Sequence, residues 1–81
     1  MGKKYKRPTW LEIRKVLIKE FGFNEIKGTK HILLEKKVGN KTRPLALERK
    51  NQILGKKALG IIIRELRQDF GIDKDEFLSK F

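Results

Sequence analysis

The stretch KHILLEKKVGNKTRPLALER, residues 30–49, decides the fold of this chain. Residues 30–37 and 42–49 each hold several large apolar or β-branched side chains in a short run, which is typical of strands. Between them lie Gly39 and Asn40, two residue types that can adopt the positive φ of a tight turn. The stretch therefore predicts two antiparallel strands joined by a short loop at 38–41.

A third strand is expected directly before this pair. Phe23–Lys27 is a short apolar-containing run, and Gly28-Thr29 predicts a tight turn into the strand that follows. Pro44 has no N–H to donate to a ladder, so the last strand should be an edge strand or should begin near Pro44. Three consecutive antiparallel strands in a meander follow from these signals.

Helices are predicted before and after the three strands in the sequence. The first helix is expected over Thr9–Phe21 and begins with a capping box. In it the Thr9 hydroxyl and the Glu12 carboxylate each accept a hydrogen bond from a free backbone N–H. A second helix should begin near Gly55 and end at Gly71, and Asp73 should start a short final helix. The second helix carries an apolar stripe at helical spacing. Its members are Leu59, Ile62, Ile63, Leu66 and Phe70.

The expected fold is therefore α+β, in the order α-β-β-β-α with a short C-terminal helix. Both long helices should pack on one face of a three-stranded antiparallel sheet. Residues 1–8 form a basic flexible arm in this interpretation, residues 9–81 a single domain, and residues 50–54 a linker before the second helix.

Composition limits the functions open to this domain. The chain has 81 residues, no cysteine and one histidine, so thiolate zinc sites and all-histidine metal sites within one chain are excluded, and no cofactor is expected. No apolar run is long enough to cross a bilayer, and the basic start is no signal core, so we expect a cytoplasmic protein without membrane contact. A net charge of +11 predicts a polyanionic partner, RNA or DNA.

The same order of elements, together with four quoted stretches, resembles the HicA family of small toxin endoribonucleases. The stretches are FGF at 21–23, KGTKHILLEK at 27–36, RPLAL at 43–47 and LGIIIRELRQDFGIDKDEFL at 59–78. The resemblance covers roughly residues 9–80. It implies a fold like that of double-stranded-RNA-binding domains, cleavage of mRNA without a metal, and a cognate antitoxin, expected to be acidic, as partner.

The resemblance also directs attention to the single histidine. The family has Gly-Ser-His after its first strand, and that histidine is catalytic. Here Gly28 and Thr29 match Gly-Ser, Lys30 stands where the histidine would be, and His31 follows. Successive strand residues point to opposite faces, so in the family register Lys30 would face the open side of the sheet and His31 the helices or the sheet margin. A bulge at Gly28-Thr29 would return His31 to the open face.

Metal-free RNA cleavage needs a base for the 2′-hydroxyl and cations for the charge that develops on the phosphate. His31 would be the base, because the histidine pKa lies near working pH, with Lys30, Lys27 and Arg43 as cations. Alternatively Lys30 is the base, which requires its pKa to fall by about 3 units. The simplest alternative is that His31 is a strand residue whose ring covers apolar surface.

Basic residues gather at further places. One group surrounds the loop between the second and third strands, and another brackets the start of the second helix, where free N–H groups favour phosphate. Together with two residues beside His31, the residues expected to bind nucleic acid are Lys27, Thr29, Lys36, Lys37, Lys41, Arg43, Lys50, Lys56 and Lys57. The aromatic residues fit the core, so recognition of backbone and shape is favoured over base stacking.

The acidic residues give weaker signals. Asp69, Asp73, Asp75 and Glu76 could hold Mg²⁺, although helix capping explains Asp73 and Glu76 more simply. Two functions stay open: a HicA-like RNA-binding toxin with endoribonuclease activity, and a non-catalytic RNA- or DNA-binding module of the same fold. A monomer or a small homo-oligomer fits either function.

Overall fold

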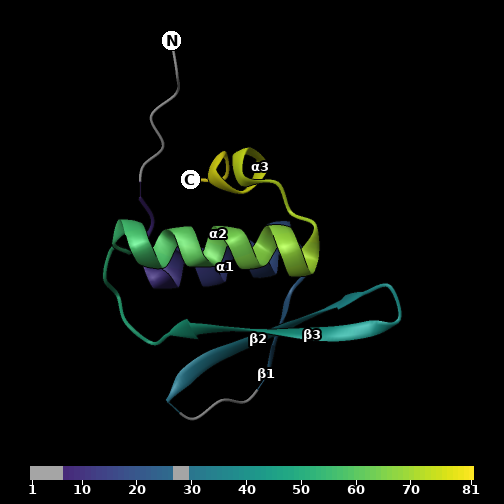
Figure 1. Cartoon of the computed structure of the whole chain (residues 1–81). Helices are drawn as coiled ribbons and strands as arrows, with labels where there is room; N and C mark the ends of the chain where they lie inside the picture. Colours follow the sequence, from purple (N-terminus) through teal and green to yellow (C-terminus); the bar gives the residue numbers. More distant parts are fainter. Residues whose placement is uncertain (1–6, 27–29) are drawn as a thin grey trace.

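The computed structural model describes residues 7–26 and 30–81, and its elements follow the predicted order (Figure 1). The elements are α1 (Trp10–Glu20), β1 (Asn24–Ile26), β2 (His31–Val38), β3 (Lys41–Glu48), α2 (Lys56–Phe70) and α3 (Lys74–Leu78). The protein is a small α+β fold, as expected. Within the described ranges, no helix is long and apolar enough to cross a membrane.

The three strands form an antiparallel meander in the order β1-β2-β3, which confirms the predicted topology. β2 and β3 pair along their whole length, from His31 opposite Glu48 to Val38 opposite Lys41. The connecting turn holds two residues rather than the expected four, because Gly39 adopts a φ of 64° and the ladder continues to the turn. Only glycines have positive φ in the described residues, so Gly39 and not Asn40 takes this conformation in the turn.

One face of the sheet is covered by helices and the other is open (Figure 1). On the covered face Leu34 lies opposite Leu45 and Ile32 opposite Leu47, and all four are at most 2% exposed. They join α1 and α2 residues, such as Ile13 and Leu66, in one core. Because side chains alternate along a strand, His31, Leu33 and Glu35 point to the open face.

Aromatic residues close the core near the ends of α1 and α2. The rings of Phe23 and Phe70 lie 4.8 Å apart. Phe77 of α3 is fully buried and contacts Phe21 and Phe81, with ring centroids 6.3 and 5.2 Å away. The short C-terminal helix is therefore attached to the end of α1 by apolar contacts.

The predicted helix ends are present. Thr9 and Glu12 form the reciprocal capping box of α1. The Thr9 nitrogen lies 2.9 Å from the Glu12 carboxylate oxygen that accepts its hydrogen bond, and the Glu12 nitrogen lies 3.1 Å from the Thr9 hydroxyl oxygen. Asp73 caps α3 by accepting hydrogen bonds from the N–H groups of Asp75 and Glu76. Gly71 ends α2 with a φ of 67°, a conformation in which a side chain would be strained.

The segment before α2 is more ordered than a linker. The Trp10 N–H donates to the Gln52 carbonyl at 3.1 Å, and the Leu54 N–H donates to the Pro8 carbonyl at 3.0 Å. These bonds flank the isolated β-bridge between Thr9 and Ile53. Leu54 is 1% exposed, and Pro8, assigned above to the flexible arm, is fully buried. Residues 1–6 lie outside the described part of the chain.

Candidate nucleic-acid interface

His31 is the first residue of β2, exposed, and on the open face of the sheet. The register that would turn His31 toward the helices is therefore wrong, because Ile32 and Leu34 occupy that side. Lys30 precedes the strand and is exposed. The proposed bulge at Gly28-Thr29 lies outside the described residues, as does Lys27.

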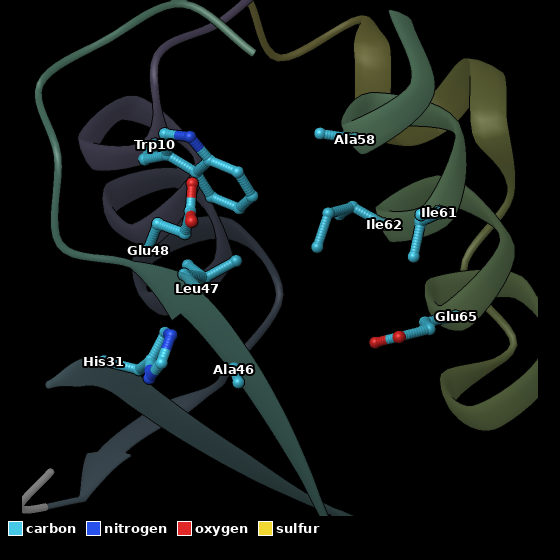
Figure 2. Close-up of a pocket in the computed structure, with 9 residues that line it drawn as sticks. All are labelled: Trp10, His31, Ala46, Leu47, Glu48, Ala58, Ile61, Ile62 and Glu65. Carbon is cyan, nitrogen blue, oxygen red and sulfur yellow. The ribbon is translucent and has the colours of Figure 1, made fainter. Parts of the chain in front are cut away.

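A cleft of about 360 Å³ lies beside His31, between the edge strand β3 and the helices. Figure 2 shows Trp10 and the α2 side chains facing each other across it, with His31 and Glu48 on the sheet side. The other lining residues are Ala46, Leu47, Ala58, Ile61, Ile62 and Glu65. The described lining of the cleft is thus apolar with two carboxylates, and it contains no lysine or arginine. Carboxylates repel phosphate, so the described residues of this cleft do not supply the cations that cleavage chemistry needs.

The hairpin end carries the first predicted basic group. The ammonium of Lys36 lies 5.6 Å from the centre of the Phe23 ring, on the covered side of the sheet. Arg43 is opposite Lys36 and forms an ion pair of 3.9 Å with Asp69 near the end of α2. The charges of Lys36 and Arg43 thus already interact with groups of the protein itself. Lys37 and Lys41, in contrast, are exposed and form no ion pair among the described residues.

Arg43 also lies away from His31. The two residues are at opposite ends of the β2–β3 ladder and on opposite faces, because Arg43 pairs with Lys36 and His31 pairs with Glu48. The structure therefore does not bring Arg43 to His31 as a cation for phosphate.

The start of α2 carries the second predicted group. Lys50, Lys56 and Lys57 are exposed. Gly55 is the N-cap and supplies no side-chain hydrogen bond, and the first turn contains no acidic residue. The free N–H groups of the first turn therefore lie beside two lysines, an arrangement that favours anions.

The acidic residues have structural roles. Asp69 pairs with Arg43, and Asp73 caps α3. No group of three potential metal ligands occurs in residues 7–26 and 30–81. The sequence interpretation that favoured capping over a Mg²⁺ site at Asp73 agrees with the observed hydrogen bonds.

Sequence reasoning missed cations on one flank of α2. Arg64 and Arg67 line a cleft that adjoins α3, and Lys56 and Arg7 line its continuation. The signal was available, because Lys56, Gly60, Arg64 and Arg67 recur at intervals of four, four and three residues and so share one helix flank. Only the apolar stripe of this helix and the lysines at its start were considered in the sequence analysis.

A scan of protein-family models and searches of curated proteins and solved structures find no match to this chain. Its function must therefore be inferred from its own residues.

Proposed function

We propose that this protein is a cytoplasmic RNA-binding module that holds the sugar-phosphate backbone, with the start of α2 as its main contact. The observation that carries the proposal is a difference between the three helices. α1 and α3 begin with side-chain caps and have Glu12, or Asp75 and Glu76, in the first turn. α2 begins with Gly55 and two exposed lysines.

This start is unfavourable for the helix itself. The N-terminus of a helix carries a partial positive charge, so an acidic residue there stabilises the protein by about 0.3–1 kcal/mol and a lysine has the opposite effect. A phosphate placed at the N-terminus reverses the penalty by accepting hydrogen bonds from the free N–H groups. A sequence that departs from local stability rules at one place marks that place as a candidate for function.

The overall charge supports the same ligand. Lys and Arg number 21 against 10 Asp and Glu, and only three ion pairs occur between the described residues. The remaining cations would attract nucleic acid and release its counterions on binding. The α-β-β-β-α order is that of double-stranded-RNA-binding domains, in which phosphate and 2′-hydroxyl contacts dominate recognition. That arrangement is part of the proposal.

The test measures the dissociation constants of labelled single-stranded RNA, double-stranded RNA and DNA over a range of salt concentrations. Replacing Lys56 and Lys57 by Gln should weaken binding of the preferred RNA and make the slope of log K against log salt about 1–2 less steep. Replacing Lys15 and Lys19 of α1 by Gln removes the same charge elsewhere and should have a clearly smaller effect. Equal losses in both double variants would contradict a localised contact.

A HicA-like endoribonuclease is the second candidate, and the exposure of His31 on the open face favours it. In this case His31 takes the 2′-hydroxyl proton, Lys30 stabilises the phosphate, and an acidic antitoxin protein covers the face. Purified protein should then cut RNA in the presence of EDTA, and His31→Ala should abolish the cleavage. Loss in Lys30→Ala alone would move the base role to the lysine, and no cleavage by wild type would leave the binding module.

A further inference from the structure

The two exposed flanks of α2 differ in charge. The flank toward β3 presents Ala58, Ile61 and Glu65 to the cleft beside His31. The opposite flank faces α3 across two adjoining clefts of about 350 and 530 Å³, which share Gly60, Ile63 and Lys74. We call this combined depression the α2–α3 groove.

All charged residues that line the α2–α3 groove are cations. They are Arg7, Lys56, Arg64, Arg67 and Lys74. They come from the segment before α1, from α2 and from the first residue of α3, so they lie on more than one wall. None takes part in the ion pairs that occur in the described parts of the chain. The fold therefore leaves these charges available to a ligand, in a concave place whose described lining contains no carboxylate.

Gly60 provides an independent observation. It lies inside α2, in the second turn of the helix, where glycine is less favourable than alanine. A Cβ at this position would meet no atom within 4 Å, and the φ of Gly60 is not positive. Neither packing nor backbone conformation requires a glycine here. Its effect is to keep the floor of the groove low, so that a ligand can approach the helix closely.

The size of the groove agrees with a chain-like ligand. From Lys56 to Arg67 the helix advances about 16 Å, which is long enough to meet successive phosphates of one strand. Half-buried Leu59 and Ile63 form apolar floor between the cations. A depression between two helices admits a single backbone more easily than the convex surface of a duplex.

We propose that the α2–α3 groove is a second RNA contact, which takes the phosphodiester backbone of a single strand against Gly60. The proposal rests on RNA binding as inferred above and adds a place on the opposite side of α2 from His31. Phosphates pair with Arg64, Arg67 and Lys74, and a ribose lies over the helix at Gly60.

Gly60 permits a test that leaves the net charge unchanged. Gly60→Leu fills the groove and should lower the affinity for single-stranded RNA about tenfold or more. Gly60→Ala should bind RNA more weakly than wild type while its melting temperature rises by roughly 2–8 °C, because it removes unfolded-state freedom without a clash. Arg64→Gln with Arg67→Gln should make the salt slope about 1.4 less steep, and Lys15→Gln with Lys19→Gln is the charge-matched control.

The possible failures can be separated. If wild type binds no RNA, the proposed function and the groove proposal fail together. If the variants of Lys56 and Lys57 weaken binding but both Gly60 variants and the double arginine variant bind as wild type does, only the groove proposal is overturned. Poly-glutamate or vesicles of anionic lipid that bind wild type but not the double arginine variant, with RNA binding unchanged, would also overturn it, because the groove would then serve a protein or a membrane.

Discussion

Phe77→Ala is expected to destabilise the whole domain, although α3 has only five residues. Phe77 is 0% exposed, and its ring contacts Phe21 at the end of α1 and Phe81 at the end of the chain. The α3 helix thus fills part of the core, and its removal would expose the ends of α1 and α2.

The magnitude follows from this burial. Truncating a buried phenylalanine to alanine costs about 3–5 kcal/mol. At about 0.05–0.15 kcal/mol per residue, an 81-residue domain has a total stability of roughly 4–12 kcal/mol. With a urea dependence of about 1 kcal/mol per molar, the midpoint should fall by about 3–5 M, or the variant should be unfolded without urea. Phe77→Leu keeps most of the volume and loses the ring contacts, so its midpoint should fall by about 1 M.

Trp10 is a suitable probe of unfolding because it is the only tryptophan and lies in α1, beside the cleft that His31 lines. Its fluorescence during urea unfolding reports the main domain rather than α3. Hydrogen exchange at the Ser79 N–H, which donates to the Asp75 carbonyl at 2.9 Å, reports α3 itself. If Phe77→Ala leaves the Trp10 midpoint nearly unchanged while the Ser79 N–H exchanges rapidly, α3 detaches alone and the reasoning is refuted.

Three further changes test individual contacts, each by its effect on the free energy of urea unfolding. Thr9→Ala should cost about 1 kcal/mol through loss of the capping box, and Thr9→Ser should restore most of it; equal values would show that the box is without effect. Gly71→Ala should cost about 1–2 kcal/mol because of its φ of 67°, whereas Gly55→Ala, at a φ of −70°, should change stability much less. Lys36→Met should cost about 0.5–1 kcal/mol, and this loss should disappear in the Phe23→Leu background if the cation–π contact is its source.

The sequence was sufficient to predict the topology of the sheet. It also held enough information to predict which face of the sheet is buried, but that information was not used fully. Both parities of β2 carry a leucine, Leu33 and Leu34, so alternation within β2 could not identify the buried side. The predicted loop already implied that residue 34 pairs with Leu45, and β3 has leucines only on that face. Its pattern therefore selects the side of Leu34 as buried and places His31 in the open. The face of His31 was left open in the sequence analysis because each strand was considered alone.

The site could be predicted only where neighbouring residues along the chain make it. The lysines at the start of α2 are adjacent in sequence, so the sequence alone could group them as a candidate contact. The α2–α3 groove joins Arg7, α2 and Lys74, which are far apart along the chain, and only the packing of α3 brings them together. The pairing of Arg43 with Asp69 likewise depends on where the hairpin end meets α2.

The β-bridge between Thr9 and Ile53 has a consequence for the order of folding. It closes a loop that contains α1 and the whole sheet, whereas the β2–β3 hairpin closes over two residues. Short loops close at little entropic cost and within microseconds, so the hairpin can form early, and the bridge must wait until its two ends meet. We therefore expect Leu54→Pro, which removes the N–H that donates to the Pro8 carbonyl beside the bridge, to accelerate unfolding more than it slows folding.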